Sequence, residues 1–190
     1  MSIQTLLTWF DGTPSNAPGY RSYPDRAGDA DAVLRASAPG VKARARLRVG
    51  IPRVLNMWST HQFWVGFLEA LGFDPRRIDF SSDTSEDQAR EFGKGRGTVD
   101  CCYPVKCVSG HYGELLARDG HRKIDILLSP MIFSLPSFLN GHVAVSLACP
   151  RVMAAPENIK AGFIKERDAF AELGIRYAAP YVALAEPELV

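Results

Sequence analysis

Residues 124–128, Ile124-Asp125-Ile126-Leu127-Leu128, are the clearest buried strand in this sequence, and they set its fold class. A short apolar run bounded by polar and turn-forming residues is typical of a strand in the interior of a sheet. Similar apolar runs predict further strands over residues 47–51, 78–80, 143–147 and 175–177.

Segments with helical periodicity alternate with these strands. Capping boxes predict helix starts at Ser59 and Ser85, each with a glutamine three residues later. Proline in a first helical turn predicts two more starts, at Pro104 and at Pro156. The alternation of strand and helix predicts an α/β fold, with a mostly parallel, flavodoxin-like or Rossmann-like sheet and helices on both faces.

The chain has 190 residues, of which 46% are apolar, and this is enough for one sizeable core. We predict one α/β domain over residues 47–190. Residues 11–40 are rich in Gly, Pro, Ser, Asp and Ala, so residues 1–46 are predicted to be an extended or mobile leader. The basic residues that alternate at its end, from Lys42 to Arg48, are interpreted as a solvated approach to the first strand, the alternative being an anion or partner patch.

Charge and hydropathy exclude two classes of partner. The formal net charge is +1, so no global field favours nucleic acid or an anionic membrane. No apolar run approaches the roughly 18 residues that a membrane span needs. The first residues lack the basic segment and long apolar core of a signal peptide, so a cytoplasmic location is expected.

Three of the four cysteines lie in the stretch CCYPVKC at residues 101–107, and the fourth, Cys149, precedes Pro150. In a cytosolic protein, clustered cysteines are more often metal ligands or redox groups than structural bridges. Cys102 and Cys149 both follow predicted strands, so they are expected to face one site at the carboxyl end of the sheet, where a metal or iron–sulfur centre can form. The alternative is that they are buried thiols that pack as small apolar groups.

Cys107 and His111 lie four residues apart on one predicted helix and therefore share a face. Together with Cys102 and Cys149 they offer a second possibility, a zinc site with three cysteines and one histidine. A different interpretation makes His111 a capping or core-edge residue. The sequence contains no phosphate loop, no dinucleotide-binding fingerprint after a strand and no G-x-S-x-G elbow, so no ATPase or hydrolase machinery is recognisable.

Five segments in order carry a recognisable pattern: residues 49–57 (VGIPRVLNM), Phe63-Trp64 with 71–73, residues 100–106 (DCCYPVK), residues 129–132 with 135–139, and residues 148–152 with Pro156-Glu157. They resemble the DUF2229 domain of acyl-CoA dehydratase activase-related proteins, which are also called CoA-substrate-specific enzyme activases. The resemblance extends from Val49 to Tyr181 and covers most of the chain. The family is related to 2-hydroxyacyl-CoA dehydratases, benzoyl-CoA reductases and double-cubane cluster proteins.

In those relatives, cysteines at strand ends hold a [4Fe–4S] cluster that receives a low-potential electron from an ATP-hydrolysing activase. The resemblance implies that Cys102 and Cys149 are cluster ligands, whereas Cys101 and Cys107 lie outside the family pattern. Cys107 is the best local candidate for a third ligand, because it follows Cys102 by five residues.

The resemblance therefore implies an iron–sulfur domain of a 2-hydroxyacyl-CoA dehydratase-like or reductase-like system, and it leaves open whether the chain is itself an enzyme. Its expected partners are an ATP-dependent activase, in trans or as a missing domain, and a second cysteine-bearing subunit or a second copy of the chain. The alternative is a non-catalytic scaffold, or a zinc-binding domain, with an incomplete cluster site.

Overall fold

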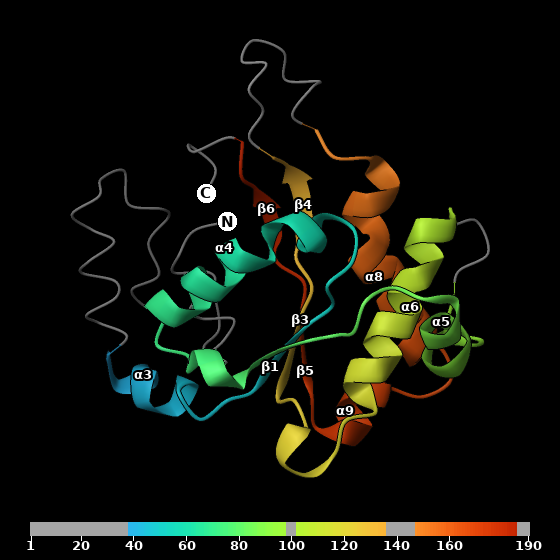
Figure 1. The fold of residues 1–190 in the computed structure, drawn as a ribbon. Coiled ribbons are helices and arrows are strands. Elements are labelled where there is room, and N and C mark those ends of the chain that lie inside the picture. The colour runs from blue at the N-terminus through green and yellow to red at the C-terminus, as the bar shows by residue number, and fades with distance from the viewer. Residues whose placement is uncertain (1–37, 98–101, 136–146, 186–190) are drawn as a thin grey trace.

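A computed structural model describes residues 38–97, 102–135 and 147–185 of the chain (Figure 1). At its centre lies a four-stranded sheet made of β1 (Val49–Ile51), β2 (Ile78–Phe80), β3 (Ile126–Leu128) and β5 (Arg176–Ala178). The strand order is β2-β1-β3-β5, and every neighbouring pair is parallel. The predicted mostly parallel sheet is confirmed.

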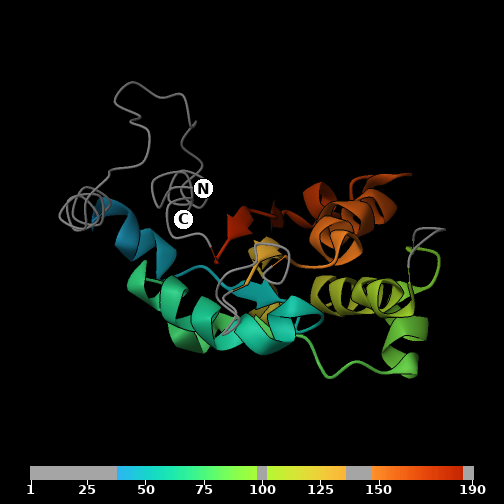
Figure 2. The same ribbon diagram turned by 90° about the horizontal axis from the view of Figure 1, so that it is seen from above.

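Helices cover both faces of this sheet, as predicted (Figures 1 and 2). On one face lies α4 (Asn56–Ala70), and on the other lie α6 (Tyr103–Leu116), α8 (Pro150–Ile164) and α9 (Ala169–Leu173). The helix α5 (Glu86–Gly93) packs against α6. Because the strands are parallel, the loops that leave their carboxyl ends gather at one end of the molecule.

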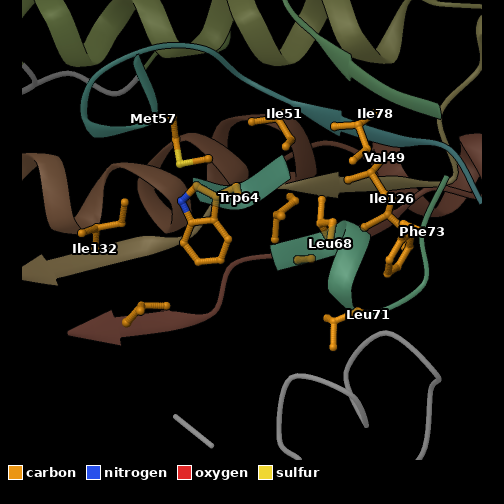
Figure 3. Packing of buried hydrophobic residues seen from close by; sticks show 13 residues of the cluster. Val49, Ile51, Met57, Trp64, Leu68, Leu71, Phe73, Ile78, Ile126 and Ile132 are labelled. Atoms are coloured by element: carbon orange, nitrogen blue, oxygen red, sulfur yellow. The ribbon is translucent and has the colours of Figure 1, made fainter. Parts of the chain in front are cut away.

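Each face of the sheet has its own apolar core, because successive side chains of a strand point to opposite faces. Ile126 and Leu128 pack with Trp64 and Leu68 of α4 (Figure 3). Leu127, which lies between the two strand residues, packs instead with the cluster on α6, α8 and α9. The fully buried strand at residues 126–128 is the pattern from which the sheet was predicted.

Two further strands, β4 (Met131–Ser134) and β6 (Tyr181–Ala183), extend the sheet beyond the predicted strand ends. They pair in parallel with the same register as β3 and β5, so Pro130 lies opposite Pro180. Proline has no backbone N–H to donate. The hydrogen-bond ladder between the two chain segments is therefore interrupted at these prolines and resumes with β4 and β6. Ser129 and Pro130 therefore form a two-residue break between β3 and β4.

Two predicted helix starts also need correction. The helix α4 begins at Asn56, and Ser59 lies inside it, with its hydroxyl donating to the backbone oxygen of Asn56. Likewise α8 begins at Pro150, so Pro156 lies in the middle of the helix. The start predicted at Ser85 is confirmed, because its side chain accepts a hydrogen bond from the backbone N–H of Gln88.

The remaining elements are short. Two 3₁₀ turns, η1 (Pro75–Arg77) and η2 (Gly120–Arg122), precede β2 and β3. The strand predicted over residues 143–147 lies mostly outside the described residues, and Leu147 forms a single antiparallel bridge with Ser134.

Within the described part of the chain, no helix is both long enough and apolar enough to cross a membrane.

Part of the predicted leader is visible as the helix α3 (Ala38–Arg44). The side chain of Arg44 is 1% exposed, and its Nε donates to the backbone oxygen of Leu71 at 2.7 Å. The interpretation of this basic segment as uniformly solvated is therefore wrong at Arg44. Residues 1–37 lie outside the described residues, and the domain boundary at residue 47 stays a prediction.

Candidate functional site

The strand order reverses between β1 and β3. From β1 the chain moves to β2 on one side, and then returns to β3 on the other side of β1. In open parallel sheets, ligands bind beyond the carboxyl ends of the strands at such a reversal. A pocket of about 20 Å³, which is room for about one water molecule, lies at this point. Its walls are Pro52 and residues 54–57 after β1, Ser129, Pro130 and Ile132 after β3, Val108 of α6, and Val152, Ala155 and Pro156 of α8.

Cys102 and Cys149 occupy equivalent positions at the starts of two helices whose later turns line this pocket. Cys102 is the N-cap residue of α6 and is half-buried, and Cys149 is the N-cap residue of α8 and is exposed. Val108 and Ala155, which both line the pocket, each lie six residues after the respective cysteine. Val152, which also lines the pocket, lies only three residues after Cys149. At about 1.5 Å of rise per residue, the N-cap of α8 therefore stands roughly 5 Å along its helix from the nearest lining residue, and the N-cap of α6 roughly 9 Å. Figure 1 shows both helices beginning at the same end of the molecule.

Three helices present uncapped N-termini near the pocket. Leu55, Cys102 and Cys149, the N-cap residues of α4, α6 and α8, make no side-chain capping hydrogen bond to any described residue. By contrast, Ser85 and Asp168 cap α5 and α9 in the ordinary way. Backbone oxygens already accept from the Met57 and Trp58 N–H groups of α4 and from the Val152 N–H group of α8. What the three helix starts share is therefore the positive end of the helix dipole. This end of the sheet therefore favours negative groups such as thiolates.

Cys107 lies on a different face of α6 from the pocket. It is buried, and it borders a groove formed with Ala89 and Gly93 of α5 and with Tyr103. Among the described residues, no group of three His, Cys, Asp or Glu side chains could hold a metal ion, so Cys102, Cys107 and Cys149 do not come together as one donor set. Cys101 lies outside the described residues. The chemistry present suits an iron–sulfur cluster only in part, because the described chain offers two thiols, as N-cap residues of α6 and α8, at this end of the sheet.

His111 is fully buried and serves as an interior hydrogen-bonding centre. Its Nδ1 accepts from the Ser81 hydroxyl at 2.7 Å and from Gln88 Nε2 at 3.3 Å, which leaves Nε2–H to donate to Thr84 Oγ1 at 2.9 Å. Burial lowers the pKa of His111 to about 4, so the ring is neutral at pH 7. Both ring nitrogens are used within the protein, which agrees with the core-edge interpretation of this residue.

A polar network around Glu114, which the sequence did not single out, joins α6 to the segment after β2. Its carboxylate accepts from the backbone N–H and hydroxyl of Ser82, from Gln88 and from Arg118. Burial opposes ionisation of this carboxyl, but the hydrogen bonds from Ser82, Gln88 and Arg118 hold its pKa below the usual value. The polar run SSDTS after β2 is the sequence signal that could have located this network.

Two buried donors near the pocket were also missed. Asn56 Nδ2 and Trp64 Nε1 find no hydrogen-bond partner in the part of the chain that the structure describes. Beside them, Leu55 has φ 53° and ψ −131°, a backbone conformation that residues other than glycine rarely adopt. No local sequence signal reveals a missing partner, because the environment of each donor is set by the tertiary fold.

Comparison with known proteins gives one family. The family model described as "CoA enzyme activase uncharacterised domain (DUF2229)" matches residues 48–189, which is most of the chain. The matched range includes the whole sheet and both N-cap cysteines. No curated protein and no solved structure matches the chain.

Proposed function

The chain belongs to the DUF2229 family of CoA enzyme activase domains, and we propose that it supplies two thiolate ligands, Cys102 and Cys149, to an iron–sulfur cluster in a CoA-enzyme activation system. The observation that carries this proposal is the shared position of the two cysteines, as N-cap residues of α6 and α8 at one end of the sheet. A bound iron–sulfur cluster supplies one-electron transfer at low potential.

The residues around the two cysteines support this role. Pro104 and Pro150 lie in the first turns of the two helices, and they fix the backbone that carries each thiol. The uncapped helix ends offset the negative charge of two thiolates. Cys149 is exposed, so a ligand from another chain can approach it.

The proposal requires a partner. A [4Fe–4S] cluster is ordinarily held by four cysteine thiolates, and the described residues place two at this end of the sheet. We propose that the remaining ligands come from a second cysteine-bearing subunit or from a second copy of this chain. The electron donor would be an ATP-dependent activase, acting in trans or as a further domain, and no phosphate loop occurs within these 190 residues.

Anaerobic reconstitution of the full chain with iron and sulfide tests the ligand assignment. Cys102→Ala and Cys149→Ala should each lose most of the bound iron and most of the visible absorbance from thiolate-to-iron charge transfer. Cys107→Ala is the matched control and should keep the wild-type iron content, because Cys107 faces α5. Equal iron loss in all three variants, or no iron in the wild type with any partner, would sink the assignment.

The stoichiometry separates the two kinds of partner. If two copies share one cluster, the reconstituted protein should contain one cluster for every two chains and should elute as a dimer that dissociates when iron is chelated. If a different subunit completes the site, the isolated chain should remain monomeric. It should then acquire the cluster only when that subunit is added.

A further inference from the structure

We propose that the groove between α5 and α6 binds the phosphate groups of a small molecule. This inference goes beyond the proposed function, because it needs neither an iron–sulfur cluster nor a protein partner. The groove has two lobes, and Ala89 of α5 and Tyr103 of α6 are walls of both. The glycine-rich turn at residues 93–97, where α5 ends, borders the second lobe.

The two lobes have room for such a ligand. Their volumes are about 590 Å³ and about 390 Å³. Sites that hold small molecules in proteins usually measure roughly 300 to 1,000 Å³. Since the lobes share two walls, one ligand can extend from the first lobe into the second.

Positive charge predominates in the lining of the groove. Arg90 and Lys94 line the first lobe, and Lys106 lines the second. The one acidic side chain in the described lining, Glu86, accepts a hydrogen bond from Arg90 at 2.8 Å, so these two charges offset each other. The ammonium groups of Lys94 and Lys106 form no ion pair or hydrogen bond with the residues that the structure describes. Two positive charges in the groove are therefore available to a ligand.

The glycine-rich turn adds another cation and an accessible backbone. Lys165 Nζ donates to the backbone oxygen of Gly95 at 3.0 Å, which places a further ammonium group at the wall of the second lobe. At Gly97 the φ angle is not in the left-handed region, and nothing described lies within 4 Å of an added methyl group. Neither conformation nor packing requires a glycine there, whereas glycine does allow a ligand to approach the backbone closely.

Phosphate matches this arrangement better than a carboxylate does. A phosphate monoester carries a charge of about −1.5 to −2 at pH 7, so a single compact group can satisfy two ammonium groups. Lysine binds phosphate as a point charge, without the planar geometry that arginine imposes. The side chain of Tyr103, which is 61% exposed at the junction of the lobes, adds a hydroxyl that can donate to a phosphate oxygen.

Isothermal titration calorimetry on the full chain, purified without iron, tests this proposal separately from the cluster. The probe is sodium pyrophosphate, at an ionic strength of about 0.15 M to screen weak surface contacts. It should bind at a single saturable site. Hexaglutamate carries several negative charges on a flexible peptide, and it should bind at least about tenfold more weakly if the groove selects phosphate rather than an acidic protein segment.

Substitutions in the groove complete the test. Lys94→Gln and Lys106→Gln should each weaken pyrophosphate binding about tenfold, because each removes one charge-assisted contact. Gly97→Ala keeps every charge and should also weaken binding, because its methyl group occupies the side from which the ligand approaches. The control is Lys123→Gln, an exposed lysine outside the groove that should bind like the wild type.

Denaturant unfolding should give all four variants the wild-type midpoint, since all four positions are exposed. The proposal is overturned if pyrophosphate shows no saturable binding, or if hexaglutamate binds as tightly. It is also overturned if Lys123→Gln loses as much affinity as the groove variants, or if Gly97→Ala or both groove lysine variants bind like the wild type.

Discussion

His111 is a buried neutral histidine, and its titration should make the stability of the protein depend on pH. Burial lowers its pKa from 6.5 to about 4 in the folded state. Between these two values the unfolded chain binds a proton that the folded chain does not, so the free energy of unfolding falls as the pH falls from 6.5 towards 4. The shift corresponds to about 3 kcal/mol over the whole window.

Denaturant unfolding at several pH values between 7 and 4 checks this expectation. His111→Gln removes the titrating group, so the dependence of unfolding free energy on pH should flatten within this window. His121→Gln is the matched control at an exposed position and should keep the wild-type slope. Glu114 affects the free energy of unfolding at lower pH. Its pKa is held below the ordinary value of 4.5, so its stabilising contribution is lost only as the pH falls below that value. A slope that survives in His111→Gln would show that another group causes it.

At the scale of elements, α5 and α6 pack unusually closely, because small residues line their contact. A methyl group on Gly113 would lie 2.1 Å from the backbone oxygen of Phe92, and that oxygen belongs to the helix and cannot move aside freely. We expect Gly113→Ala to lower the free energy of unfolding by about 2 kcal/mol through overpacking.

The matched control for this prediction is Gly66→Ala, in the middle of α4. Nothing lies within 4 Å of the added methyl group there, so the higher helix propensity of alanine should raise stability by up to about 1 kcal/mol. Thermal and denaturant unfolding of the two variants should therefore shift in opposite directions. A Gly113→Ala protein as stable as the wild type would mean that the two helices can separate at little cost.

The helices and strands also show how far sequence reasoning extends. The buried run at residues 126–128 and the helical periodicity between strands predicted the parallel sheet, because burial on both faces leaves a local signature. The strand extensions were missed since Pro130 and Pro180 usually end strands, and only their opposite placement in the ladder allows both strands to continue. Pro156 was misread as a helix start because proline inside a helix is costly, whereas Pro150 marks the true start.

At the scale of the whole molecule, the sequence located half of the candidate site. Cys102 and Cys149 were predicted to face one site, and the structure places both at N-caps of neighbouring helices at one end of the sheet. The unpaired donors of Asn56 and Trp64 were not predicted, since an absent partner is a property of the tertiary fold and leaves no local pattern. The strand order brings the loops after β1 and β3 together, because the order reverses between these two strands.

The helix α3 is part of the folded domain. Arg44 donates to Leu71 at 2.7 Å, and a methyl group on Gly72 would meet Val41 at 2.7 Å, so α3 is packed against the end of α4. A protein beginning at residue 38 keeps these contacts, and one beginning at residue 47 loses them. We expect the shorter protein to have a free energy of unfolding lower by about 2 kcal/mol, the value typical of a hydrogen bond to a charged group. Arg44→Ala in the full chain should also lower the free energy of unfolding. Equal unfolding free energies for the two truncated proteins would show that α3 adds no stability and that the domain begins, energetically, at residue 47.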